Sequence, residues 1–318
     1  MKPESGAFAA TGEGFWHRAK VVVRSWADSD FITDETASDK KFAWSRCFPF
    51  VLVHLGCFAA FYTGASAAAL WAALFWYAFR VFALTAFYHR YFSHRAFKAN
   101  RFWQFMFAVA GMTAIQRGPL WWAAHHRRHH LYADSEEDAH SPLQGVLWSH
   151  FGWFTCEKNF PTRYQSVRDF ARYPELMFLN RFDWLVPIIF LSGMWGFGEW
   201  LATAHPQLET NGMQMLVWCG FISTVAVYHA TFCVNSLCHL FGKRPYASDD
   251  HSRNNWMVAL LTFGEGWHNN HHRYPGSARQ GFRWWQIDIT YQILRVMAFL
   301  RIIKNLRQVP ETVVNEAK

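Results

Sequence analysis

The sequence predicts an all-helical integral membrane protein, with four membrane-spanning helices and a polar helical cap on one side of the bilayer. Hydrophobic residues make up 52% of the chain and charged residues 17%, against about 25% charged in typical soluble domains. The mean hydropathy of −0.08 is low for a protein built of spans alone. A substantial polar portion must therefore accompany the spans.

The first two spans are predicted at 46–62 and 67–88. From position 48 to 88 the chain contains one charged residue, Arg80. A span needs about 20 residues, so this stretch holds two helices. The turn between them has no Lys or Arg and both outer flanks are basic. The positive-inside rule therefore places both ends of the pair in the cytoplasm.

The third and fourth spans are predicted at 184–204 and 213–234. The segment 206–212 between them has no Lys or Arg, so it is predicted to lie outside. The chain then returns to the cytoplasm before residue 235. The apolar stretch 102–115 is too short to span and is predicted to form a buried or interfacial helix.

The remaining segments complete the domain organisation. Residues 1–45 are predicted to form a loosely ordered cytoplasmic tail that ends in an interfacial segment, and residues 46–290 form the membrane domain. Residues 291–318 are predicted to form a C-terminal amphipathic helix and tail on the membrane surface. Both termini are thus cytoplasmic. The net charge of +8 fits cytoplasmic loops and lipid head groups, and no recognised nucleic-acid motif accompanies it, so no nucleic-acid partner is predicted.

Histidines at metal-ligand spacings give the strongest functional signal. Two segments, HHRRHH and WHNNHH, contain the pattern HxxHH, which places three imidazoles on one helix face. A further pair is five residues apart in YHRYFSH, which predicts a helix end or a distortion, and an Asn and a His are four apart in VNSLCHL. The candidate ligands are His89, His94, His126, His129, His130, Asn235, His239, His268, His271 and His272.

Nine histidines exceed the ligand set of one metal ion, since a tetrahedral site takes four. Two ions with four or five ligands each fit the count. Imidazole suits zinc, copper and nickel as well as iron, and we favour two irons. Every cluster falls at a cytoplasmic span end or in a cytoplasmic segment. The acidic run 134–138 is either a solvated loop or a source of carboxylates that orient the imidazoles, Asp138 above all.

The motifs HRYFSHRAFK, HHRRHH followed by DAHSP, NSLCHLFGKRPY and GEGWHNNHHRYP resemble the histidine boxes of membrane fatty acyl-CoA desaturases, the stearoyl-CoA delta-9 type. The resemblance runs from about residue 48 to residue 289. It implies an oxidoreductase of unsaturated fatty acid biosynthesis, whose cytoplasmic cap holds a di-iron centre. Such enzymes use dioxygen and two electrons to make a cis double bond in a long-chain acyl-CoA. The ten residues above would then bind two Fe²⁺ ions, Asn235 through water, with no catalytic side chain beyond them.

The resemblance also implies substrate contacts. The residues that match the family's acyl tunnel near its bend are Gln116, Trp122, Thr231 and Phe232, the last standing where animal members carry Trp. Trp122 and Phe232 equally fit ordinary packing. Animal relatives have an Arg-Asp pair where this chain has Ala124 and His125. This departure leaves acyl-lipid and acyl carrier protein open as carriers beside CoA, which is favoured.

Helix geometry suggests where the acyl chain would end. Counted back from His89, Tyr77 and Ala73 lie roughly 18 and 24 Å away at 1.5 Å per residue. A fatty tail reaches comparably far beyond its middle carbons. Bulk at Tyr77 or Ala73 is therefore predicted to close the tunnel, the alternative being that Tyr77 packs against a neighbouring span.

The remaining predictions concern partners and competing functions. About 30 residues follow position 287, too few for a fused cytochrome b5 domain, so a separate donor is predicted, cytochrome b5 or a ferredoxin with its reductase. A related membrane di-iron hydroxylase is the alternative enzyme. A metal transporter is the alternative of another class. Transporters place polar ligands near the bilayer midplane, whereas these ligands gather at one face.

Overall fold

The computed structural model describes residues 15–31 and 42–317, and the regular secondary structure of this part is helical apart from two short strands. Within it, four helices are long and apolar enough to cross a membrane: Trp44–Thr63, Ala67–Ser93, Leu185–Ala204 and Gly212–Leu240. The prediction of an all-helical membrane protein with four spans is confirmed. The second and fourth helices run several residues beyond their predicted ends. The side of the membrane on which each end lies stays a prediction.

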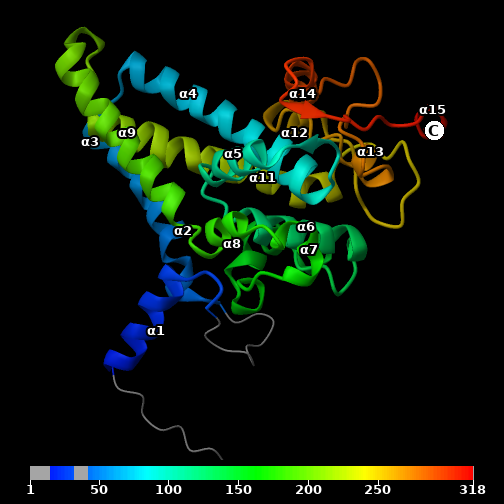
Figure 1. Cartoon of the computed structure of the whole chain (residues 1–318), viewed down its shortest axis with the longest axis horizontal. Helices are drawn as coiled ribbons and strands as arrows, with labels where there is room; N and C mark the ends of the chain where they lie inside the picture. The colour runs from blue at the N-terminus through cyan, green and yellow to red at the C-terminus, as the bar shows by residue number, and fades with distance from the viewer. Residues whose placement is uncertain (1–14, 32–41, 318) are drawn as a thin grey trace, which may run out of the picture.

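The spans are built from shorter elements: α2 (Trp44–Gly56), η1 (Cys57–Ala59), α3 (Ala60–Thr63), α4 (Ala67–Phe82), η2 (Ala83–Ser93), α9 (Leu185–Ala204), α10 (Gly212–Met215), η9 (Leu216–Ile222) and α11 (Ser223–Leu240). The other helices are α1 (Phe15–Ala27), α5 (Arg101–Met112), α6 (Pro119–Tyr132), α7 (Arg168–Ala171), α8 (Pro174–Arg181), α12 (Trp256–Leu261), α13 (His268–Arg273), α14 (Ile289–Phe299) and α15 (Glu311–Val314). In Figure 1, α3 and the adjoining ends of α4 and α9 lie together at one end of the molecule, and α6, α12, α13 and α14 lie toward the other.

Short segments complete the chain: η3 (Pro142–Gln144), η4 (Trp148–Gly152), η5 (Trp153–Thr155), η6 (Glu157–Asn159), η7 (Tyr164–Val167) and η8 (Pro206–Leu208). Strand β1 (Lys98–Ala99) pairs antiparallel with β2 (Ile303–Lys304), with Lys98 opposite Lys304. This pair ties the segment after the second span to the segment after α14.

Polar side chains begin several helices where the sequence supplies them. The Ser66 hydroxyl accepts a hydrogen bond from the Ala69 N–H at 3.1 Å, and the Asn100 side chain accepts one from Trp103 at 2.9 Å. Helix α6 lacks such a residue, because Gly118 stands before it. Asn180 of α8 replaces the cap, since its Oδ1 accepts hydrogen bonds from the N–H groups of Leu120 and Trp121 at 3.1 and 2.8 Å. A distant helix therefore fixes the start of α6.

The chain between His89 and His94 is distorted as the spacing predicts. The segment η2 is a π-helix, and the His94 N–H donates to the His89 carbonyl at 3.2 Å, five residues back. A π-helical turn brings residues five apart closer to one face than an α-helix does. Both histidines therefore face the same side of the second span.

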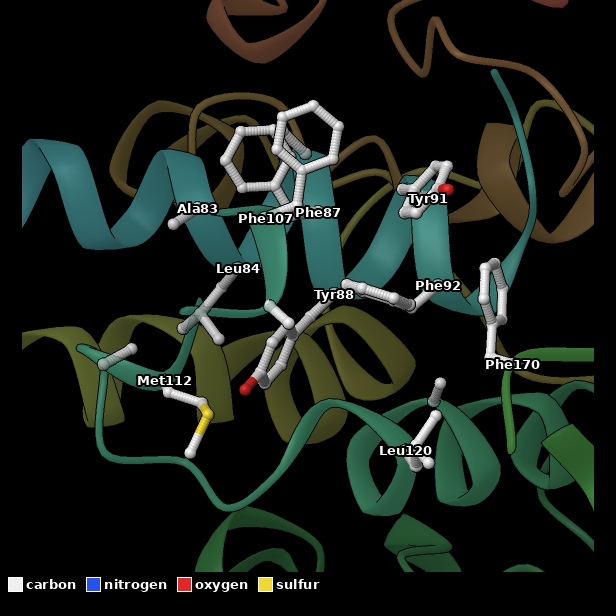
Figure 2. Close-up of a cluster of buried hydrophobic side chains, with 14 of the residues drawn as sticks. Ala83, Leu84, Phe87, Tyr88, Tyr91, Phe92, Phe107, Met112, Leu120 and Phe170 are labelled. Atoms are coloured by element: carbon white, nitrogen blue, oxygen red, sulfur yellow. The ribbon is translucent and has the colours of Figure 1, made fainter. Parts of the chain in front are cut away.

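A buried aromatic core holds η2 in place (Figure 2). The rings of Phe87 and Phe107 stack with centroids 4.0 Å apart, and Phe170 lies 5.0 Å from Phe92. Tyr88 packs so closely on α5 that a Cβ at Gly111 would overlap its ring. The core thus joins the second span to α5 and α6.

The two ends of the chain differ from expectation in part. Residues 15–27 form the helix α1, so the expectation of loose order is wrong for this stretch, and residues 1–14 and 32–41 lie outside the described part. Helix α14 begins at residue 289, two residues before the predicted start of the C-terminal amphipathic helix at 291. Its exposed Val296 and Phe299 fit an interfacial helix. The domain boundaries at 45 and 290 stay predictions.

Candidate metal centre

The predicted histidines converge from four elements. His89 and His94 come from η2 and its end, His239 comes from α11, and α6 and α13 supply three each. A first group contains His89, His94, His126, His130 and His271, and a second contains His129, His239, His268 and His272. Within each group, one ligand atom per residue lies within 4.8 Å of all the others. The structure therefore brings all nine histidines together at two points.

The two HxxHH motifs divide their histidines between the two groups in opposite ways. In α6, the first and last histidines, His126 and His130, belong to the first group, while His129 belongs to the second. In α13, His268 and His272 belong to the second group and His271 to the first. Each i, i+4 pair thus faces one group and each i+3 residue faces the other. The spacing alone indicated a common face and not this division.

Carboxylates contact the Nδ1 nitrogens of four histidines. The Nδ1 atom of His129 lies 2.9 Å from Asp138, that of His239 lies 3.0 Å from Asp134, and that of His272 lies 2.6 Å from Asp250. Glu265 contacts Nδ1 of His89 in the same way. A carboxylate at Nδ1 places the proton there and leaves the Nε2 lone pair free to bind metal.

The carboxylates at Asp250 and Glu265 are functional candidates that sequence reasoning missed. Glu265 stands three residues before His268, which was a usable signal in GEGWHNNHH. Asp250 lies in a polar loop far from any box and gave none. Together with Asp134 and Asp138, the four carboxylates carry a charge equal to that of two divalent cations. Neutral imidazoles could not supply that balance.

Burial lowers the pKa of most of the nine histidines and favours neutral imidazole there, but the pKa of His129 is raised, because Asp138 outweighs the effect of burial. Burial, reinforced by neighbouring histidines, holds the pKa well below its usual range for His94, His126, His130, His268 and His271. Burial alone would raise the pKa of Asp138, but His129 and His140 hold it below its usual range. Neutral imidazole and ionised carboxylate are the forms that a metal site requires.

One contact shows that a cation fits this site. The Nε2 atoms of His129 and His272 face each other at 3.3 Å, although a carboxylate holds Nδ1 of both rings. Two facing lone pairs repel each other unless a cation lies between them. A metal ion satisfies these and the other ring nitrogens together, which a single proton does not. The all-imidazole inner set suits iron, and also zinc, copper or nickel.

A cavity of about 510 Å³ is lined by His126 of the first histidine group and by Asn235, whose part in metal binding stays a prediction. All four residues predicted near the tunnel bend line it: Gln116, Trp122, Thr231 and Phe232. The Gln116 amide donates to the Thr231 hydroxyl at 2.8 Å. The Trp122 ring stacks on the His126 ring with centroids 5.1 Å apart.

Tyr77 and Ala73 lie elsewhere, and neither is among the residues that line this cavity. The Tyr77 hydroxyl donates to the Leu261 carbonyl of α12 at 2.8 Å. Ala73 packs in a separate apolar cluster with Leu201 and Met215. The structure therefore does not bring these two residues to the space beside the metal centre.

Comparison with known proteins places the chain in a family. The family model described as fatty acid desaturase matches residues 65–299, most of the chain. The chain belongs to the fatty acid desaturase family. Its relatives in this family include a probable chloroplastic lipid desaturase of Arabidopsis thaliana, which is 38% identical over 66% of this chain and 55% of the relative.

Other relatives differ in the substrate that their names state. An acyl-CoA C20 delta-5 desaturase of Anemone leveillei is 35% identical over 66% of this chain and 64% of the relative. An sn-1 stearoyl-lipid 9-desaturase of Anabaena variabilis is 36% identical over 64% of this chain and 71% of the relative. The matched region spans only about 54–64% of the first four curated relatives. The names of the relatives therefore fix neither the carrier nor the position of the double bond for this chain.

Proposed function

We propose that this protein is a dioxygen-dependent desaturase that introduces a cis double bond into a saturated long-chain fatty acyl group, at the delta-9 position. The observation that carries the proposal is the pair of histidine groups, one of which contributes His126 to the lining of a largely apolar cavity. Membership of the fatty acid desaturase family supports desaturation rather than hydroxylation. The product would serve unsaturated fatty acid biosynthesis.

The metal ligands follow the two groups. One Fe²⁺ ion would be held by His89, His94, His126, His130 and His271, and the other by His129, His239, His268 and His272, with Asn235 reaching the second through water. When bound, the iron pair supplies the oxidising power needed to remove hydrogen from an unactivated methylene. The carboxylates hold four of the rings in the ligating tautomer, and the remaining residues shape the acyl site.

The overall reaction balances without any further reagent beyond an electron donor. Two C–H bonds of adjacent methylenes break and a C=C bond forms. Those two hydrogens, two electrons from the donor and two protons from water reduce dioxygen to two water molecules. The donor is proposed to be a separate cytochrome b5, or a ferredoxin with its reductase, that reaches the centre from the cytoplasm.

The residues at the inner end of the cavity would position the acyl chain. Gln116 and Thr231 hold each other across it, and the Trp122 indole covers the His126 ring. Phe232 adds an aromatic wall. These groups keep water from the reacting carbons and fix which carbon pair lies beside the histidines. CoA is the carrier of the acyl chain that the sequence predicts.

Expression in a desaturase-deficient host tests the proposal. Mass spectrometry that locates double bonds should find a new delta-9 monoenoic acid. His129→Ala and His271→Ala should abolish it without changing membrane insertion, and His205→Ala, an exposed histidine outside both groups, should not. Hydroxy fatty acids instead of monoenes would assign the hydroxylase function. Stoichiometric zinc in a fully active preparation would contradict the assignment of iron, for which about two ions per chain are expected.

A further inference from the structure

The most exposed residues that line the cavity lie on helices that are predicted to span or border the membrane. Of its lining residues, those classed as exposed are Trp26, Pro49, Leu52, Trp184 and Ile188. They belong to α1, α2 and the start of α9, so within the described part of the chain every exposed wall is a span or the helix next to it. Leu52 and Ile188 are 49% and 51% exposed, on helices whose surroundings would be lipid.

The route inward from this mouth is apolar. Val53 and Phe50 of α2, Leu191 of α9, and Tyr228 and Phe232 of α11 also line the cavity, together with Asn235. The Tyr228 and Phe232 rings stack with centroids 5.6 Å apart. A hydrocarbon chain fits such a wall, because it offers apolar contact and needs few polar partners.

The described lining of the cavity offers no unpaired Arg or Lys for the phosphates of CoA. The phosphorylated nucleotide of CoA carries several negative charges and binds best where cations are free to pair with it. Arg46 and Arg117 are the cationic Arg or Lys side chains among the described lining residues. Arg117 pairs with Asp183 at 2.7 Å, and Arg46 lies 3.8 Å from Glu157. Neither is free to bind a phosphate.

Helix α1 lies beside the mouth, and its contacts fit a position at the membrane interface. The Trp26 indole donates to the Ser45 carbonyl at 2.6 Å, and the Trp184 indole donates to the Ala27 carbonyl at 2.9 Å. These bonds hold the end of α1 beside the starts of α2 and α9. Exposed Trp side chains are typical of the membrane interface, and an amphipathic helix lies in that plane. The ester bonds of glycerolipids lie at this depth.

We infer that the substrate is an acyl chain esterified to a membrane glycerolipid, and that it enters the cavity sideways from the bilayer between α2 and α9. The inference rests on the proposed function, because it takes the cavity as the acyl site. The head group stays at the interface beside Trp26 and Trp184, while the acyl chain passes Leu52 and Ile188 to reach the histidines. The carrier is then a lipid and not the predicted CoA.

The decisive experiment compares the two carriers in a purified system. Iron-loaded protein is reconstituted into vesicles of phosphatidylcholine, phosphatidylethanolamine and phosphatidylglycerol that carry one deuterated stearoyl chain, with a reduced ferredoxin or cytochrome b5 system. Stearoyl-CoA with a different isotope label is added to the same vesicles. The lipid-bound chain should be desaturated, and the label from stearoyl-CoA should not appear in the monoene.

Variants at the mouth supply a matched control on each helix. Ile188→Trp and Leu52→Trp should lower turnover of the lipid-bound chain about tenfold, because the added bulk obstructs the entrance. Ile189→Trp and Leu55→Trp place the same side chain on exposed positions that do not line the cavity, so they should retain turnover. Equal turnover of all four variants would overturn the lateral entrance.

A binding measurement separates failure of this inference from failure of the proposed function. Phosphatidylcholine with a diazirine at the end of one acyl chain should cross-link to peptides of α2 and α9 in metal-free protein, and Ile188→Trp should suppress the cross-link while Ile189→Trp should not. Desaturation of stearoyl-CoA alone, or the absence of this cross-link, would overturn lipid entry and leave the proposed function standing. Cross-linking without desaturation of either carrier in iron-loaded protein would support lipid entry and overturn the proposed function.

Discussion

Replacing Asp138 by asparagine tests whether the carboxylates around the histidines set the affinity for metal. Asp138 is 1% exposed and accepts a hydrogen bond from Nδ1 of His129 at 2.9 Å. It also accepts bonds from the N–H groups of Asp134 at 3.0 Å and His140 at 3.2 Å. Asparagine keeps the size of the side chain and one oxygen. It lacks the charge that holds the proton on Nδ1 of His129.

The expected loss follows from the position of His129 in the second group. Removing the carboxylate partner of a ligating histidine costs about 10–100-fold in metal affinity. This equals about 1.4–2.7 kcal/mol of binding free energy. Water cannot replace the lost charge at a buried position, so the upper part of that range is expected. Glu136→Gln changes an exposed carboxylate two residues away and should leave the affinity unchanged.

The assay is a competition between the purified protein and a chelator for Fe²⁺ under anaerobic conditions, with Co²⁺ as a spectroscopic substitute. Asp138→Asn should release one of two ions at a lower chelator concentration, while the ion of the first group stays bound. Thermal unfolding of the metal-free proteins checks that the fold is retained. Wild-type affinity for both ions in a folded Asp138→Asn protein would refute the role assigned to this carboxylate.

Three further predictions concern stability, each measured by thermal unfolding in detergent. Removing the metal with a chelator should lower the unfolding temperature, because a ligand that binds only the folded state stabilises it; equal temperatures with and without iron would contradict this. Gly111→Ala should lower the free energy of unfolding by about 1–3 kcal/mol, because the added Cβ would overlap the Tyr88 ring. At Gly193 an added Cβ meets no atom within 4 Å, so Gly193→Ala should not destabilise the protein. Asn180→Ala should lower the free energy of unfolding by roughly 2 kcal/mol, because it removes the cap of α6. Asn180→Asp keeps the acceptor oxygen and should lower this free energy less.

Local patterns predicted the spans and the distortion at His94, because both depend on neighbours in sequence. Hydropathy over about 20 residues identifies a span. Two histidines that are five residues apart do not fit one face of an α-helix. The capping of α6 by Asn180 was beyond such reasoning, since the two residues that meet are about 60 positions apart. No pattern within α6 indicates which distant side chain replaces the missing cap.

The placement of Tyr77 and Ala73 shows a second limit. The rise of an α-helix gives distances along one span, and the prediction assumed that the acyl chain runs beside that span. The cavity that His126 lines is instead bordered by residues of α2, α9 and α11, so the tunnel end at Tyr77 and Ala73 stays a prediction that this cavity does not support. A helix face can be read from spacing, but the helix that packs against it cannot. Tyr77 accordingly contacts Leu261, which no spacing relates to it.

The division of the HxxHH motifs joins these two kinds of information. Within each motif, the spacing fixes an i, i+4 pair and an i+3 residue on neighbouring lines of one helix. Only the placement of α6 opposite α13 decides that His129 joins His268 and His272, while His271 joins His126 and His130. Each helix therefore contributes to both groups, and neither group is complete without both helices. The separation of the two histidine groups then depends on how α6 is placed relative to α13, and the buried core and the Asn180 cap help to set it by fixing α6.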